Sequence, residues 1–121
     1  MSRPGSIACL LGILLTTISN TVHTATDQEI NALLHFVASS GCVFMRNGDS
    51  YEASRAADHL RLKYQRGQRY IDTADQFIDR LASESSWTGK PYTVQCGQQK
   101  MTSREWLHDA LAALRQQTPG K

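Results

Sequence analysis

Apolar residues occur along this chain in one unbroken run, followed by several periodic segments. The unbroken run, Ile7–Ile18, holds twelve apolar or small residues, with Arg3 before it and the small and polar stretch 19–25 after it. This order of charge, apolar run and small-residue zone predicts a secretory signal peptide over residues 1–24. A membrane anchor would need about 20 residues in a helix. We therefore expect the leader to be cleaved, leaving no transmembrane anchor.

Four later segments show the apolar spacing of amphipathic helices, over about residues 27–40, 53–66, 72–83 and 102–118. Their apolar positions are, in chain order, Ile30, Leu33, Leu34 and Val37; Ala56, Ala57, Leu60 and Tyr64; Phe77, Ile78 and Leu81; and Trp106, Leu107, Ala110, Leu111 and Leu114. Capping-box pairs are expected at three of the starts, namely Thr26 with Glu29, Thr73 with Gln76, and Thr102 with Glu105.

Two short segments rich in strand-forming residues, 42–46 and 92–96, lie between these helices. Asn47-Gly48 follows the first of them and predicts a tight turn. The next residues, 49–52, are equally compatible with a second hairpin arm and with a cap for the following helix, since Asp49 and Glu52 have capping-box spacing.

The two predicted strands have a natural antiparallel register. Its pairs are Cys42 with Cys96, Phe44 with Val94, and Arg46 with Tyr92. Strand alternation places the first two pairs on one face, which the first, third and fourth helices are expected to cover. The predicted fold is α+β and mainly α: about four helices packed on a short antiparallel two-stranded sheet, with one disulfide.

The cysteines support this register. Cleavage of the leader removes Cys9 and leaves Cys42 and Cys96, which should pair in an oxidising compartment. Their spacing fits neither a Cys-X-X-Cys redox pair nor a metal-ligand cluster. We predict a structural disulfide.

Length and charge limit the possible functions. Without residues 1–24, 97 of the 121 residues remain, enough for a single domain over 25–121. They carry twelve basic and eleven acidic side chains, a balance that argues against a general binder of nucleic acid or membrane surfaces. No internal repeat is visible in the sequence.

The strongest functional candidate is a basic surface on the second helix. Arg55, His59 and Lys63 are spaced by four and share one helical face, where an anionic group could bind. The favoured alternative is an ordinary solvated face opposite the apolar stripe. The candidate binding residues are Arg46, Asn47, Tyr51, Arg55, His59, Lys63 and Trp87.

Trp87 lies in a turn rich in Ser, Gly and Pro. We expect it to pack over the sheet, because a small domain needs its large apolar groups, and keep an exposed binding role as the alternative. Ser83, Ser85 and Ser86 are interpreted as turn residues, because no Gly-X-Ser-X-Gly elbow surrounds them.

His59 could also serve as an acid or base with a carboxylate partner. Adjacent Asp58 is a poor partner, because neighbouring helical side chains point about 100° apart. Glu52 and Asp49 remain open. His-X-X-X-His spacing is absent, so we expect no metal and no cofactor, and we assign no catalytic residue.

An ordered series of short motifs resembles a known family. It comprises Phe44-Met45-Arg46-Asn47-Gly48 with Tyr51, His59-Leu60, Lys63-Tyr64, the segment 77–83, Ser85-Ser86, Gly89-Lys90-Pro91-Tyr92 and Cys96. Over about residues 29–114 the chain is similar to the YfeK-like family of small bacterial proteins of unknown function. The resemblance implies a periplasmic protein of the Gram-negative envelope, and supplies no substrate, cofactor or catalytic residue.

Taken together, these observations predict an exported periplasmic protein that acts as a non-enzymatic binding or protein-interaction module. Its partner would be an envelope protein or an anionic envelope component. Two other functions stay open. One is a small hydrolase or transferase that uses His59 as acid or base, and the other is a structural envelope protein that self-associates.

Overall fold

The computed structural model describes residues 20–117, so most of the predicted leader lies outside the described residues. The elements are α1 (Asn20–Ser39), β1 (Val43–Arg46), β2 (Asp49–Glu52), α2 (Ala53–Gly67), the short 3-10 helix η1 (Gln68–Tyr70), α3 (Ala74–Leu81), β3 (Thr93–Cys96), β4 (Gln99–Thr102) and α4 (Ser103–Gln117). Across residues 20–117, no helix combines the length and the apolar character that crossing a bilayer requires.

The first helix begins earlier than predicted. It starts at Asn20, since no glycine or proline interrupts residues 20–26. Thr26 is therefore inside the helix and is not its N-cap; its hydroxyl donates to the carbonyl oxygen of Asp72 at 2.9 Å. The predicted caps of the later helices are confirmed, because Thr73 accepts from the backbone N–H of Gln76 and Thr102 accepts from that of Glu105.

The sheet has four strands in the order β2-β1-β3-β4, not the two that were predicted. The register of the central pair is confirmed, with Phe44 opposite Val94. The ladder ends at Met45 and Thr93, one pair before Arg46 and Tyr92.

Residues 49–52 form the second arm of a hairpin, which settles the question that the sequence left open. Asn47 and Gly48 both have positive φ, 52° and 86°, as the hairpin turn of type I′ requires. Gly97, with φ of 63°, stands first in the two-residue turn that joins β3 to β4.

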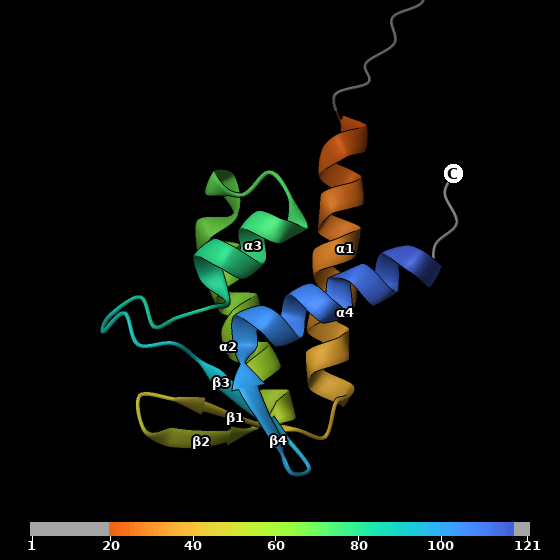
Figure 1. The fold of residues 1–121 in the computed structure, drawn as a ribbon. Coiled ribbons are helices and arrows are strands. Elements are labelled where there is room, and N and C mark those ends of the chain that lie inside the picture. The colour runs from red at the N-terminus through yellow and green to blue at the C-terminus, as the bar shows by residue number, and fades with distance from the viewer. Residues whose placement is uncertain (1–19, 118–121) are drawn as a thin grey trace, which may run out of the picture.

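The helices form a layer against one face of the sheet. In Figure 1, α4 crosses α1, and the sheet lies at the lower end of the helical layer. The elements that contact the sheet are α2 and α4, whereas α3 packs on α1, α2 and α4 at the far end. Of the predicted covering by the first, third and fourth helices, only that by the fourth is confirmed, and α2 takes the place of the other two. Trp106 of α4 is half-buried and packs on Phe36 and on Phe44, with ring centroids 4.7 and 5.3 Å apart.

The predicted disulfide joins Cys42 and Cys96 across the ends of β1 and β3. Tyr64 of α2 donates a hydrogen bond of 2.9 Å to Asp27 and so connects the second helix with the first. The core comprises the predicted apolar stripes, and its largest fully buried side chains are Phe77, Ile30, Leu33, Leu34, Ile78, Leu107 and Leu111.

A repeat that the sequence does not reveal organises the chain. A series of strand, two-residue turn, strand and 15-residue helix begins at Val43. The same series begins again at Thr93, 50 positions later. Matched positions of α2 and α4 are buried in both copies, as in Ala53 and Ser103, Ala57 and Leu107, and Leu60 and Ala110. The repeat is hidden because these equivalent positions carry different side chains.

Candidate functional site

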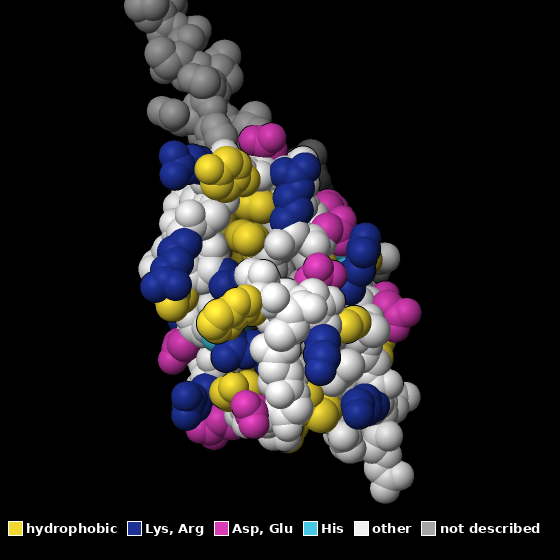
Figure 2. All heavy atoms as spheres, turned by 90° about the vertical axis from the view of Figure 1, so that its left-hand side faces the viewer, with side chains coloured by type: hydrophobic (Ala, Val, Ile, Leu, Met, Phe, Trp, Pro, Cys, Tyr) yellow, Lys and Arg dark blue, Asp and Glu magenta, His cyan; other side chains and the backbone are white. Residues whose placement is uncertain are grey.

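A cleft of about 450 Å³ lies between α2, the end of β1 and the loop of residues 83–91. Its lining residues are Arg46, Asn47, His59, Lys63, Arg66, Ser85, Ser86, Trp87 and Tyr92. Five of the seven residues predicted from the sequence thus line one cavity. Figure 2 views the side from which this loop projects, and shows Lys and Arg side chains distributed around hydrophobic ones.

A hydrogen-bonded chain runs along the floor of the cleft. Lys63 Nζ donates to Tyr92 Oη at 3.0 Å, and Tyr92 Oη lies 3.2 Å from Nε2 of His59. Arg46 Nη1 lies 3.2 Å from the same nitrogen. Arg46 Nη1 also lies 3.5 Å from Nδ1 of His59. Because an ammonium and a guanidinium can only donate, Tyr92 accepts from Lys63, and Arg46 donates to an unprotonated ring nitrogen of His59.

These donors define the state of His59. Since the guanidinium of Arg46 can only donate, a ring that accepts from it is neutral. Burial lowers the pKa of His59, and the positive charges of Arg46 and Lys63 lower it further. Neither Asp49, Glu52 nor Asp58 forms a hydrogen bond with the ring, and Asp58 pairs instead with Arg61 at 3.0 Å. The neutral His59 ring therefore positions Arg46 and Tyr92 by hydrogen bonds.

Lys63 is the most strongly perturbed cation of the cleft. Burial, aided by the charge of Arg46, lowers the pKa of Lys63 to about 8. Its ammonium also donates to the carbonyl oxygen of Glu84 at 3.1 Å and lies 5.0 Å from the centre of the Tyr92 ring. Two of its three N–H donors are therefore used within the protein, which leaves one for a ligand.

The other two predicted residues lie beside a smaller recess that shares Arg46 and His59 with the cleft. Tyr51 and Arg55 both line this recess. The guanidinium carbons of Arg46 and Arg55 lie 5.5 and 5.8 Å from the centre of the Tyr51 ring, within cation–π range. Tyr51 therefore lies between two cations and connects Arg55 with the cleft.

The loop over the cleft is organised around Ser85. The buried Ser85 hydroxyl oxygen accepts from Asn47 Nδ2 at 3.2 Å and from the backbone N–H groups of Trp87 and Thr88. The Thr88 hydroxyl donates back to Asn47 Oδ1 at 2.7 Å. Ser85 and Ser83, which donates to the carbonyl oxygen of Ile78, are structural, as predicted.

Trp87 does not pack over the sheet. The loop directs the indole outward and leaves it 91% exposed, so the favoured prediction for this residue is wrong. The physical reason is the loop itself, whose internal hydrogen bonds are satisfied without any contribution from the indole. The indole is consequently available at the rim of the cleft.

Comparison with known proteins identifies the family of this chain. Residues 24–115, which include every residue of the cleft, match a family of unknown function, DUF5329. The chain belongs to this family. It is also 44% identical over 89 residues to the uncharacterized protein YfeK of Salmonella typhimurium, covering 71% of this chain and 74% of that protein. The predicted family resemblance is confirmed. No solved structure matches the chain.

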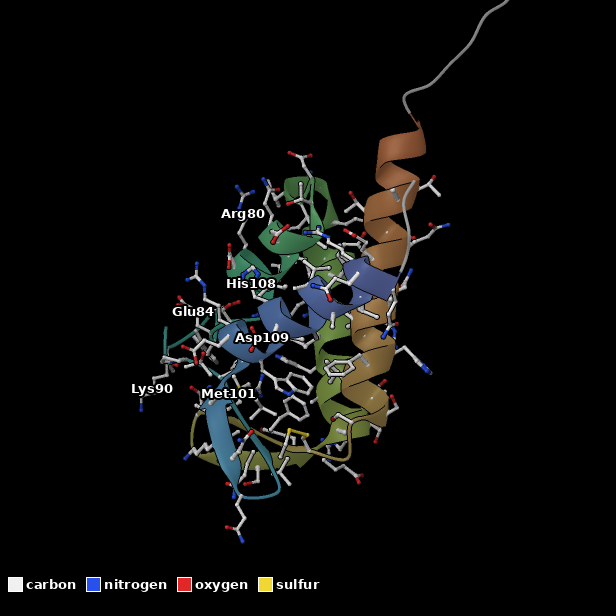
Figure 3. The ribbon with its side chains drawn as sticks, turned by 45° about the vertical axis from the view of Figure 1, so that its right-hand side comes forward. Arg80, Glu84, Lys90, Met101, His108 and Asp109 are labelled. Atoms are coloured by element: carbon white, nitrogen blue, oxygen red, sulfur yellow. A yellow bond between two sulfur atoms is a disulfide. The ribbon has the colours of Figure 1, made fainter. Side chains whose placement is uncertain are left out.

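In this DUF5329 domain, the basic side chains of the cleft differ from those of α4 in whether they form ion pairs with carboxylates. Among residues 20–117, no carboxylate forms an ion pair with Arg46, Lys63 or Arg66. The carboxylates of α3 instead pair with α4, as in Asp79 with His108 at 2.8 Å, and Figure 3 shows His108 directed from α4 toward α3. Within the same range, no group of three metal-ligating side chains occurs.

Four residues that line the cleft of this DUF5329 domain were absent from the predicted binding residues, namely Arg66, Ser85, Ser86 and Tyr92, of which the two serines had been predicted only as turn residues. Arg66 lies three positions after Lys63 and seven after His59, so extending the helical face by one turn would have included it. Tyr92 joins the site from a different part of the chain, through its contacts with His59 and Lys63. Only the strand register, which aligned Tyr92 with Arg46, pointed to it.

The bridging role of Asn47 leads to a prediction for the loop. Asn47→Gly keeps a residue that accepts a φ of 52° but deletes the amide that bonds Ser85 and Thr88. We expect the unfolding free energy to fall by about 1–2 kcal/mol in urea denaturation. Asn47→Ala adds the strain of positive φ and should cost about 1 kcal/mol more. A glycine variant as stable as the parent would contradict the bridge.

Proposed function

We propose that this protein acts in the periplasm and binds an anionic ligand in the cleft between α2 and the 83–91 loop. The observation that carries the proposal is the composition of the lining. Arg46, Lys63 and Arg66 contribute three basic side chains, and no carboxylate side chain lines the cleft. In a partly buried site, several unpaired cations are costly unless a negative charge joins them, so the cleft favours anion binding.

Export and location are part of the same proposal. The charge, apolar run and small residues of positions 1–24 support a secretory leader. The Cys42–Cys96 disulfide fits an oxidising compartment such as the periplasm.

The state of His59 favours binding over acid–base catalysis. A general base needs a free lone pair directed at substrate, and the single lone pair of the neutral His59 ring is already used by Arg46, whose Nη1 lies 3.2 and 3.5 Å from the two ring nitrogens. No carboxylate orients the ring, unlike the usual arrangement of a catalytic histidine. A hydrolase or transferase centred on His59 is therefore the weaker candidate.

Sulfate is a suitable first probe, because its charge is constant over the working pH range. Titration of the isotopically labelled protein should produce saturable NMR shifts at residues lining the cleft, especially Arg46, His59 and Lys63. Weak, unsaturated shifts at exposed cations outside the cleft, such as Arg61 and Lys100, would argue against the proposal.

Sulfate affinity should depend on pH through Lys63. The pKa of Lys63 is about 8 in the free protein, and a bound anion would raise it, so binding is tightest below pH 8. As pH rises above 8 the ammonium loses its proton, and we expect the affinity to fall about tenfold by pH 9.5. Lys63→Gln should bind weakly at every pH and lose this slope. The same slope in that variant would assign the titration to another group.

A further inference from the structure

The cleft combines its charges with an aromatic side chain that serves no structural purpose in the fold. Trp87 is 91% exposed, and none of the aromatic contacts found within residues 20–117 involves it. Exposing a large apolar ring to water is unfavourable. A ring held in this position at the rim of a polar cleft is therefore a candidate ligand contact.

The backbone that carries Trp87 at the rim of the cleft is fixed by hydrogen bonds of the loop. The Trp87 backbone N–H donates to the Ser85 hydroxyl, and the Gly89 N–H donates to the Ser85 carbonyl oxygen at 2.9 Å, which closes a tight loop. Asn47, itself a cleft residue, ties this loop to the β1–β2 turn. Such preorganisation lowers the conformational entropy lost on binding.

The shape and polarity of the site restrict the ligand. The indole of Trp87 is open to solvent and is not enclosed by an apolar pocket, which suits stacking on the C–H face of a sugar ring better than binding of an aromatic ring that needs burial on both sides. The rest of the lining is polar or charged, and Ser86 adds a hydroxyl beside Trp87. A volume of about 450 Å³ is within the range of small-molecule sites.

We propose that the ligand is an acidic sugar, whose anionic group pairs with Arg46 and Lys63 while its ring stacks on Trp87. The inference rests on the proposed function, since it names the class of anion that the cleft takes. Carboxylated and phosphorylated sugars share this chemistry.

The test compares four probes on the full domain. The first three are trigalacturonate, the neutral trisaccharide maltotriose and inorganic sulfate, and glucose 6-phosphate is added as a fourth, phosphorylated probe. We expect trigalacturonate or glucose 6-phosphate to bind more tightly than sulfate and much more tightly than maltotriose, with the indole N–H signal of Trp87 shifting. Trp87→Ala should weaken the acidic sugar about tenfold and leave sulfate affinity essentially unchanged. Trp106→Phe is the control for a tryptophan outside the cleft.

Three outcomes would overturn the inference. The first is a lack of sugar recognition, seen either as equal affinity for sulfate and both acidic sugars or as no effect of Trp87→Ala. Either result would leave the anion site of the proposed function intact. The second is equally tight binding of maltotriose, which would also count against the proposed function. The third is Trp87-dependent binding to vesicles containing phosphatidylglycerol without binding of either acidic sugar, which would assign the face to a membrane surface.

Discussion

Removing the Cys42–Cys96 disulfide is expected to lower the unfolding free energy by about 4 kcal/mol. The bond closes a loop of 54 residues, which contains β1, β2, α2 and α3. In the chain-entropy account, breaking it returns that freedom to the unfolded chain and leaves the native contacts in place. For a domain of this size the loss is a large share of total stability.

The measurement is thermal and urea denaturation of Cys42→Ala/Cys96→Ala beside the oxidised parent. We expect the midpoint of thermal unfolding to fall by about 15–30 °C. The parent treated with reductant should behave like the double variant, and this comparison separates loss of the bond from the cavities left by two alanines. An unchanged midpoint in both samples would show that the bond contributes little.

Replacing Arg46 by glutamine is expected to weaken sulfate binding by about a hundredfold, because hydrogen bonds to charged groups contribute about 1.5–3 kcal/mol each. Arg46 is the cation that lines both the cleft and the smaller recess, and it contacts His59 and Tyr51. Its loss removes a fixed positive charge and frees the acceptor nitrogen of His59. The pKa of His59 should then rise, since one cause of its lowering is gone.

The matched control is Arg61→Gln, which neutralises a cation of the same helix that pairs with Asp58 and lies outside the cleft. Sulfate affinity should change little in this variant. Histidine NMR titration gives a second readout, because only Arg46→Gln should raise the pKa of His59. Equal losses of affinity in both variants would mean that sulfate responds to overall charge and not to the cleft.

The sequence predicted the central strand pair correctly because two independent constraints agree there. Pairing Cys42 with Cys96 aligned Phe44 with Val94, and both of these side chains are buried in the structure. The helices were predicted equally well, since buried residues within one helix, such as Ile30, Leu33 and Val37 of α1, repeat at the period of a buried helix face. An element that packs against the core along most of its length therefore shows a periodic spacing of apolar residues in the sequence.

The edge strands show no such spacing of apolar residues. β4 consists of Gln99, Lys100, Met101 and Thr102, and only Met101 among them packs against the core. A strand of four residues with a single apolar side chain cannot show alternation, so it was missed. β2 was left open for the same reason, and its hairpin was indicated only by Asn47-Gly48.

The functional face was predicted in part, because helix periodicity collects Arg55, His59 and Lys63 without tertiary information. What periodicity cannot supply is the partner across the cleft. Ser85, Trp87 and Tyr92 follow α3 in the chain and reach the site through the path of their loop. The direction of a side chain in such a loop depends on hydrogen bonds like that between Asn47 and Ser85, which composition does not reveal.

The fifty-residue repeat gives the sheet an approximate two-fold axis through the Phe44–Val94 pair. That axis exchanges Arg46 with Cys96 and Cys42 with Tyr92, because each of these positions differs from its counterpart by 50. The two-fold axis thus relates the disulfide to the Arg46–Tyr92 end of the cleft, so these two sites occupy equivalent positions in the fold. The chain has the arrangement of a homodimer joined into a single polypeptide, in which one of two equivalent places holds the disulfide and the other holds two residues that line the cleft.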